Sequence, residues 1–372
     1  MREYTAVILT TLFLAWMITK TRVGPLNSIA SRNKDRVCYF VMFLLLALFI
    51  GLRTRYNDTY TYVIIYNEAP GFPEVWKSID LELGANPGFV LVNAWLRSNE
   101  VSDRDFILLY TAVSLACLIR FLKRYSNDLT LSMFLFFMTN AYTLSAAAVK
   151  QSMALGLGLL AVDFGLQRKW VRFAVFLFLG ATFHPYVLLY GLLPLLTFTP
   201  WTKKTYIMLS MFICSGFMLE SLLGTIVDIT SMIGDTYETE ELIGEGINIF
   251  RVLVANVPLV LTFLYRKQLF RDSTRSEHLM INFAMMNGAL MFVGMFGTAI
   301  YFSRLASYFT IAQCVVLPWI LSKLPRERRT FYTLGMIVGY LGFFVYANMI
   351  SQSFSANFSR ITLGTYLRNY VF

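Results

Sequence analysis

Charged residues are scarce in this sequence. Asp, Glu, Lys and Arg make up 15% of the 372 residues, whereas 57% are hydrophobic and 16% are aromatic. Water-soluble domains carry about 25% charged residues, so this composition excludes an ordinary soluble domain and predicts a chain that lies largely in lipid. The net charge of +10 does not indicate nucleic-acid binding. The basic residues stand in short clusters between apolar runs, as topogenic loop charges do.

Cysteine and histidine are also rare, with four and two residues. The cysteines all fall inside apolar runs and show no paired spacing, which argues against a disulfide framework or a zinc site. No serine nucleophile elbow, Walker motif, zinc-ligand helix or Rossmann glycine pattern stands in a context that would support it. We therefore expect any chemistry to need neither a metal, a nucleotide nor another cofactor.

Long apolar runs dominate the rest of the sequence. A helix crosses a bilayer in about 20 residues, and runs of roughly that length predict an all-α polytopic membrane protein with about twelve transmembrane helices, some short or broken. We expect a single transmembrane domain over residues 1–372, with no soluble domain attached. The expected spans are 4–19, 37–52, 105–122, 129–146, 150–166, 171–184, 185–199, 205–223, 248–265, 278–298, 303–321 and 331–350.

The loops between these spans differ in charge. One set of alternate loops holds 21 of the 32 Lys and Arg residues. The other set includes the long segments 53–104 and 224–247, which hold most of the acidic residues. Because basic loops stay in the cytoplasm, we expect both acidic segments, and both termini, on the outer side. The segment 224–247 is expected to form a solvated cap or lid.

Two stretches are too short for ordinary spans. Residues 171–199 must leave and return between two basic loops, with His184 and Pro185 at the turn, which predicts a broken hairpin that lines a cavity. The segment 86–98 is apolar but short, so we expect a re-entrant or interfacial helix on the outer face. Its first turn is expected to consist of Asn86, Pro87 and Gly88.

Polar residues that the cytoplasmic loops do not explain gather on the outer side. They are Arg53, Arg55, Asp58, Tyr60 and Tyr62 in GLRTRYNDTYTY, Lys150 and Gln151 at the fifth span, His184 at the broken hairpin and Arg304 at the eleventh span. Arg and Lys near helix ends often only reach toward headgroups, and Asp58 could pair with Arg53 or Arg55. The positive-inside bias should nevertheless deplete outer cations, so their persistence predicts a site for an anionic group.

Five segments also carry a family resemblance. In order, GLRTRYNDTYTY, NPGFVLVNAWL, AAVKQSMALGLGLLA, ATFHPYVLL and YFSRLASYF resemble the EpsG-type members of the Wzy-like polysaccharide polymerases, from about residue 45 to 320. The resemblance implies a multi-pass glycosyltransferase of the bacterial inner membrane with a GT-C-like fold. It would join oligosaccharide repeat units carried on undecaprenyl diphosphate into O-antigen, capsule or exopolysaccharide on the outward side. A chain-length regulator protein would be a further partner.

The resemblance carries over residue by residue, with two departures. Lys150 stands where the family usually has arginine, and an ammonium cannot make the planar two-pronged contact to phosphate. Asn57 stands where glycine is common, and asparagine tolerates a left-handed backbone nearly as well. The matched positions are Arg53, Asp58, Tyr62, Lys150, Gln151, His184 and Arg304, with Arg55 a near neighbour.

The implied reaction assigns roles to these residues. Catalysis is expected from His184, Asp58 and Arg304, with His184 favoured over Asp58 as the proton acceptor. Cations would stabilise the diphosphate leaving group, and substrate binding is expected from Arg53, Arg55, Tyr60, Tyr62, Lys150 and Gln151. Two alternatives stay open. A transporter or flippase of lipid-linked oligosaccharide would place charges at several depths, and a glycan ligase or acyltransferase could use the same groups.

Overall fold

The computed structural model describes residues 2–23, 29–232, 244–297, 299–350 and 354–371 and is about 81% helical. The first half contains α1 (Arg2–Val23), α2 (Ile29–Gly51), β1 (Arg53–Arg55), α3 (Thr59–Asn67), α4 (Phe72–Val75), η1 (Leu83–Ala85), α5 (Pro87–Ser98), α6 (Asp103–Tyr125), α7 (Leu129–Met138), α8 (Ala141–Ala147), α9 (Val149–Leu166), α10 (Trp170–Ala181) and η2 (Pro185–Leu196). The second half contains α11 (Lys203–Phe217), α12 (Leu219–Met232), α13 (Ile249–Leu264), α14 (Arg266–Leu269), α15 (Arg275–Val293), α16 (Ala299–Lys323), α17 (Arg326–Val345), η4 (Tyr346–Ile350), α18 (Phe354–Asn357), β2 (Ser359–Arg360), α19 (Leu363–Tyr366) and η5 (Leu367–Val371).

Two helices form the centre of the bundle. The most apolar windows of α9 and α16 are each 78% buried inside the protein, compared with 17% for the last long helix. α9 packs against α6 and α10, and α16 packs against α15 and α7. A helix that is apolar on all sides is buried within a large bundle or faces lipid. α9 and α16 therefore belong to the core, while α17 presents most of its apolar surface to the outside.

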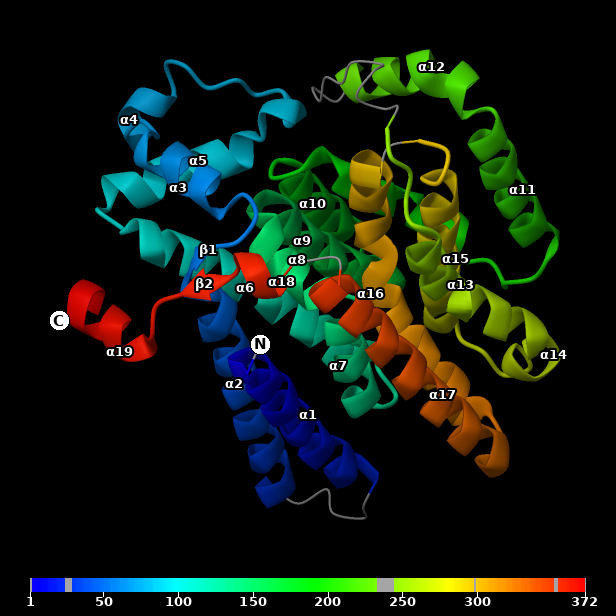
Figure 1. Cartoon of the computed structure of the whole chain (residues 1–372). Helices are drawn as coiled ribbons and strands as arrows, with labels where there is room; N and C mark the ends of the chain where they lie inside the picture. Colours follow the sequence, from blue (N-terminus) through cyan, green and yellow to red (C-terminus); the bar gives the residue numbers. More distant parts are fainter. Residues whose placement is uncertain (1, 24–28, 233–243, 298, 351–353, 372) are drawn as a thin grey trace.

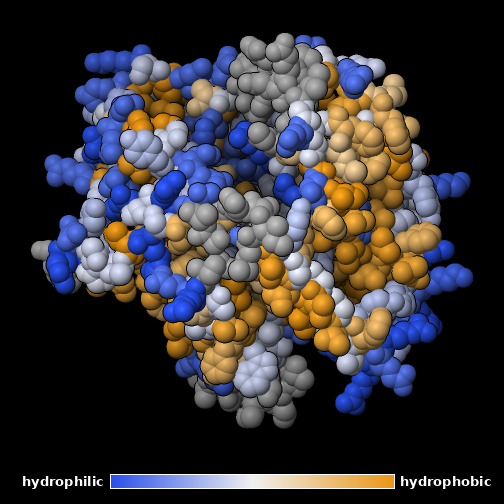
Figure 2. All heavy atoms as spheres, viewed as in Figure 1, coloured by the Kyte–Doolittle hydropathy of each residue, from blue (hydrophilic) through white to orange (hydrophobic). Residues whose placement is uncertain are grey.

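The surface is that of a membrane protein. Large apolar side chains such as Phe13, Phe178 and Phe331 are more than half exposed, and Figure 2 shows hydrophobic side chains over the right of the view, where α11, α13 and α17 lie. Among the described residues, four helices are long and apolar enough to cross a membrane, or six if each bent pair counts as one span. The all-α polytopic architecture is confirmed, whereas the predicted number of twelve spans and the GT-C resemblance are not.

Each of the twelve predicted spans contains helix, but two of them are not straight. The run 129–146 is divided into α7 and α8, which meet at 50°, and Asn140 between them has a φ of 59°. The run 205–223 is divided at Met218 into α11 and α12, which meet at 101°. The sequence predicts that some spans are broken, but hydropathy does not register where a bend falls within an apolar run.

The two ends of the molecule differ in structure. Figure 1 shows α3, α4 and α5 together at one end, with α12 on the same side, while the C-terminal end of α1, the start of α2 and the joint of α16 with α17 lie at the opposite end. The end of the molecule that holds α3, α4 and α5 is called the α3–α5 end. The predicted cap 224–247 begins as helix, because α12 continues to Met232. Residues 233–243 of that cap lie outside the described residues.

A short strand pair joins distant parts of the chain. β1 pairs antiparallel with β2, with Arg53 opposite Arg360. The backbone N–H of Ile361 donates to the Leu52 carbonyl at 3.0 Å, and Arg360 forms an ion pair with Glu3 at 2.9 Å. The C-terminal segment is therefore fastened to the stretch from which α3 emerges.

The predicted break in 171–199 is present. α10 ends at Ala181 and the 3₁₀ helix η2 begins at Pro185, with His184 extended between them. A proline at the first helical position loses no backbone hydrogen bond. η2 packs closely on α9, where a Cβ added to Gly158 would stand 2.4 Å from Val187 Cγ2. A side chain at residue 158 would therefore keep η2 from packing this closely on α9.

Candidate active site

A cavity of about 470 Å³ lies at the α3–α5 end. Its walls come from the start of α3, the residues before α5, the start of α9, the break between α10 and η2, and the first turns of α16. Six of the nine predicted site residues line it, namely Asp58, Tyr62, Lys150, Gln151, His184 and Arg304. The charged members of this set are two cations, Lys150 and Arg304, and one carboxylate, Asp58. The cavity therefore carries an excess of positive charge and suits an anionic ligand.

Asp58 and Tyr62 reach the cavity through a tight turn before α3. Asn57 has a φ of 40°, which confirms the predicted left-handed residue. Asp58 immediately precedes α3 and Tyr62 follows four residues later, so both side chains lie on one face of the helix. Burial raises the pKa of Tyr62 to about 12, as does the charge of Asp58, against a backbone hydrogen bond from Lys150 and nearby arginines. The hydroxyl remains protonated at neutral pH and can donate a hydrogen bond.

Arg53 lies inside the protein and not in the cavity wall. Its side chain is fully buried, and its Nε donates to Thr59 Oγ1 at 3.0 Å. Its Nη1 donates to the Ile50 carbonyl at 2.9 Å and to Thr111 Oγ1 at 3.0 Å. Burial lowers its pKa to about 10, so the guanidinium is still charged at neutral pH. Arg53 therefore holds the turn before α3 from within, and among the described residues its Nη2 has no hydrogen-bond partner. Its contact with substrate stays a prediction.

Two other predicted substrate contacts also lie outside the cavity wall. Arg55 is exposed on β1, and Tyr60 is 73% exposed. Tyr60 stands two residues from both Asp58 and Tyr62, which places it on the opposite face of α3. In this described segment no ion pair joins Asp58 to Arg53 or Arg55.

The start of α9 supplies Lys150 and Gln151. α8 ends and α9 begins around Ala148, whose backbone is not helical. Gln151 Nε2 donates to the Arg304 carbonyl at 2.9 Å and to Ser307 Oγ at 2.6 Å, which fastens α9 to α16 beside the cavity. Lys150 lies in the first helical turn, where the helix dipole disfavours a cation. An anionic ligand would offset this cost.

His184 is held by aromatic residues. Its Nδ1 lies 3.1 Å from the Tyr308 hydroxyl, and its ring meets the Tyr186 ring edge to face at a centroid distance of 4.9 Å. The Tyr190 hydroxyl in turn donates to the Tyr308 carbonyl. When Nδ1 carries the proton and donates it to the Tyr308 oxygen, Nε2 is the ring nitrogen that accepts a proton.

The helix α5 is hydrogen-bonded to the break between α10 and η2, which carries His184. Asn86 has a φ of 55° and Pro87 occupies the first helical position, as the sequence predicts. The backbone N–H of Gly88 donates to the Thr182 carbonyl at 2.9 Å. This contact lies two residues before His184, so the position of α5 determines where the imidazole stands.

Several residues of this region escape sequence reasoning. Tyr308 lies four residues after Arg304 on α16, and that spacing was the available signal. The cavity adjoins a second one of about 230 Å³, which shares Gln151 and Arg304 with it. A third of about 400 Å³ follows and contains Arg251. Other polar residues of these two cavities, Arg251, Asn287, Gln313 and Asn348, each stand singly in an apolar run, where no pattern distinguishes them.

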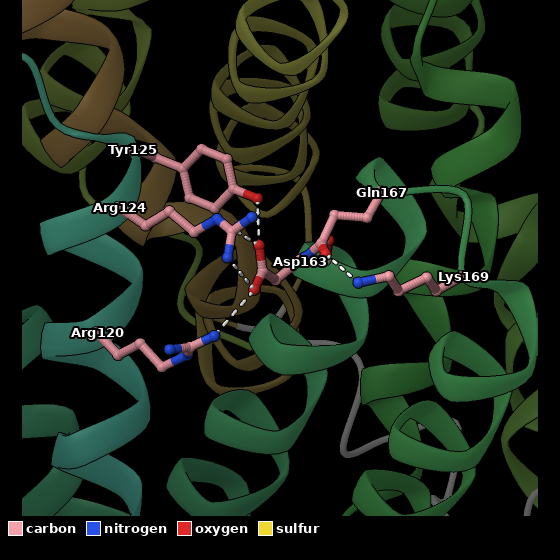
Figure 3. A network of polar contacts seen from close by, with 6 residues as sticks. All are labelled: Arg120, Arg124, Tyr125, Asp163, Gln167 and Lys169. Carbon is pink, nitrogen blue, oxygen red and sulfur yellow. Dashed lines mark hydrogen bonds and ion pairs between the residues drawn. The ribbon is translucent and has the colours of Figure 1, made fainter.

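A separate polar network lies toward the other end of α9. Asp163 is buried and accepts hydrogen bonds from the Tyr125 hydroxyl at 2.6 Å and from Arg124 (Figure 3). It forms ion pairs with Arg124 at 2.8 Å and with Arg120 at 3.3 Å. Thirteen residues separate Asp163 from Lys150, which is about 20 Å along a helix. The network joins α6 to α9 and takes no part in the cavity.

The fold and the cavity define an all-helical membrane protein with a cationic site at one end of its bundle. A family model describing the EpsG family matches residues 36–360. The chain therefore belongs to the EpsG family, which is a family of Wzy-like polymerases. No curated protein and no solved structure matches the chain.

Proposed function

We propose that this protein is a metal- and nucleotide-independent glycosyltransferase of the bacterial inner membrane. It polymerises oligosaccharide repeat units carried on undecaprenyl diphosphate, and its α3–α5 end faces outward. The family supports a polysaccharide polymerase of the Wzy type. The observation that carries the proposal is one cavity that gathers Lys150, Arg304, His184 and Asp58 from four separate parts of the chain.

The cations suit the leaving group of this reaction. A hydroxyl oxygen of the acceptor unit attacks the anomeric carbon of the donor glycan, and the bond from that carbon to the phosphate oxygen breaks. The electron pair leaves with the lipid diphosphate. Lys150 and Arg304 stabilise the developing charge, and removal of one such group costs about 10²- to 10³-fold in kcat.

The acceptor hydroxyl must lose a proton. His184 accepts it through Nε2, while Tyr308 holds Nδ1 and so fixes the orientation of the ring. Asp58 and Tyr62 stand on the facing wall, where a carboxylate and a protonated phenol can orient sugar hydroxyls. Gln151 keeps Arg304 in place through its bond to the Arg304 carbonyl.

The charge distribution favours an enzyme over a transporter. Charged side chains in the walls of the three adjoining cavities are Asp58, Lys150, Arg251 and Arg304. The other polar network, around Asp163, has none of its residues in these walls. A transport path would need charged groups at several depths along the whole bundle. A ligase would differ from a polymerase only in its acceptor, so the assay below uses lipid-linked repeat units alone.

The test is polymerisation by the purified full-length protein. Undecaprenyl-diphosphate-linked repeat units are the only substrate, and products are separated on a gel. We expect a ladder of oligomers from the wild-type protein. Lys150→Gln, Arg304→Gln and His184→Ala should each lower the rate by about 10²-fold or more. Arg326→Gln, an exposed arginine in the first turn of α17, serves as the matched control and should keep the ladder.

Two results would count against the proposal. Normal ladders from both Arg304→Gln and His184→Ala would remove the cavity from the reaction. Absence of any oligomer from well-folded wild-type protein, together with movement of the lipid-linked unit between leaflets of a vesicle, would favour a flippase.

A further inference from the structure

The third cavity forms an inner chamber beyond the proposed reaction site. We define it by Asn140, Arg251, Asn287, Thr310, Gln313 and Asn348, which line it together with apolar residues. It has a volume of about 400 Å³ and shares wall residues with the other two cavities. Asn57 belongs to the walls of the chamber and of the first cavity, and the intermediate cavity contains both Arg304 and Arg251. The chamber and the first cavity are therefore neighbours, and we infer that one extended glycan can occupy both.

The amide side chains of the chamber are fixed by one another. Gln313 Nε2 donates to Asn287 Oδ1 at 2.7 Å, Asn287 Nδ2 donates to Thr310 Oγ1 at 2.9 Å, and Asn348 Nδ2 donates to Asn140 Oδ1 at 3.0 Å. Asn287 Nδ2 and Asn348 Nδ2 each donate a second bond, to the Ala306 and Phe344 carbonyls, so both of their N–H donors are used. Among the described amides of the chamber, the N–H groups left for a ligand are those of Asn140 Nδ2 and the second N–H of Gln313 Nε2. Fixed amides and hydroxyls beside apolar surface suit the hydroxyl groups and ring faces of a sugar.

Arg251 is the exception among these neutral groups. It is half-buried in the first turn of α13, where the helix dipole disfavours a cation. In the part of the chain that the structure describes, no acidic residue lines the inner chamber or the intermediate cavity. Among the described residues, its guanidinium has no ion pair or hydrogen bond. A cation at the unfavourable end of a helix, inside a cavity without acids, calls for a negative charge from outside the protein.

We propose that the inner chamber binds a sugar that carries a carboxylate, with Arg251 on the carboxylate and the amides on the hydroxyls. The proposal rests on the proposed function and names the class of repeat unit, a glycan that contains an acidic sugar. A single guanidinium matches the single charge of a carboxylate and its two oxygens. The diphosphate carries more charge and finds two cations in the first cavity.

The test measures binding of three small probes to the full-length protein in lipid nanodiscs by saturation-transfer NMR. The probes are sodium glucuronate, glucose and inorganic pyrophosphate. We expect glucuronate to bind the wild-type protein and Arg251→Gln to raise its Kd about tenfold or more, as expected for the loss of one charge-assisted bidentate contact. Glucose should bind both proteins equally, and Arg326→Gln should bind glucuronate like the wild type.

Three outcomes would overturn the inference. The first is no binding of glucuronate to the wild-type protein. The second is equal binding of glucuronate by the wild type and by Arg251→Gln. The third is that Arg251→Gln weakens the binding of pyrophosphate and leaves the binding of glucuronate unchanged. The third result would show that Arg251 binds a phosphate group. If Arg251→Gln does not fold, Arg251→Lys decides, because it keeps the charge but loses the planar fork and should weaken glucuronate binding selectively.

Failure of the proposed function would look different. Lys150→Gln and Arg304→Gln would then leave pyrophosphate binding unchanged and no polymer would form, whatever Arg251→Gln does to glucuronate.

Discussion

Substitution of Gly88 by alanine tests how α5 positions the site. A Cβ at this residue would stand 2.2 Å from Thr182 Oγ1, 2.8 Å from Thr182 Cβ and 3.1 Å from the Thr182 carbonyl oxygen. Rotation of the threonine side chain can move Oγ1 away, but Cβ and the carbonyl oxygen stay. α5 and the break must therefore separate by roughly half an ångström or more to reach ordinary contact distance.

That displacement acts on His184, two residues beyond Thr182. A misplacement of about 1 Å in a reacting group costs about 10²-fold in rate, so we expect Gly88→Ala to lower polymerisation by about 10- to 100-fold. Overpacking should cost about 1 to 3 kcal/mol of stability, offset by about 1 kcal/mol from the higher helix propensity of alanine. The polymerisation rate should thus fall strongly, while the unfolding temperature should fall only slightly.

The assay is the initial rate of ladder formation, with thermal unfolding of the same preparation. Gly335→Ala on α17 is the matched control, because a Cβ there meets nothing within 4 Å. It should leave the rate unchanged and raise stability by about 1 kcal/mol, through the same gain in helix propensity. A normal rate from Gly88→Ala would show that the contact of α5 with Thr182 does not position His184, and the reasoning would fail.

Three further predictions use the same assays. Arg53→Lys should lower the unfolding temperature and the polymerisation rate together, because an ammonium cannot replace three directed hydrogen bonds; a fall in rate with unchanged stability would instead indicate contact with substrate. Asp163→Asn should cost about 1 to 3 kcal/mol of stability, allowing for the partly exposed arginines, and keep the polymer length, since the network lies far from the cavity; a shorter polymer at normal stability would contradict this. Incubation with EDTA should leave the rate of ladder formation unchanged, and a loss that Mg²⁺ restores would show a metal requirement.

The sequence predicts the helices well because hydropathy reports them directly. Every predicted span contains helix, and the break at His184 and the left-handed residue Asn57 follow from proline and asparagine chemistry. The bend of 101° between α11 and α12 was not predictable, since both arms are apolar. Length and hydropathy alone do not establish how many of these helices cross the bilayer.

The site was predictable in part for a related reason. Its residues could be grouped because they stand at the ends of apolar runs on one side, where positive charge should be rare. The direction of a side chain at such an end depends on tertiary packing. Arg53 and Arg55 are two residues apart, yet the first is buried and the second exposed. Arg251 stands alone in its segment, and only the fold places it in a chamber beside Arg304.

The pairing of β1 with β2 has a consequence for how the protein matures in the membrane. Synthesis proceeds from the N-terminus, so the chain around Arg53 must wait until residues 359–361 have been made before its strand partner exists. The turn that carries Asp58 emerges directly from this strand. Nascent chains that lack the last fourteen residues would therefore have every predicted membrane helix in place and still hold an unfinished site. If the proposed function is right, a chain not yet made as far as residue 359 would form no polymer.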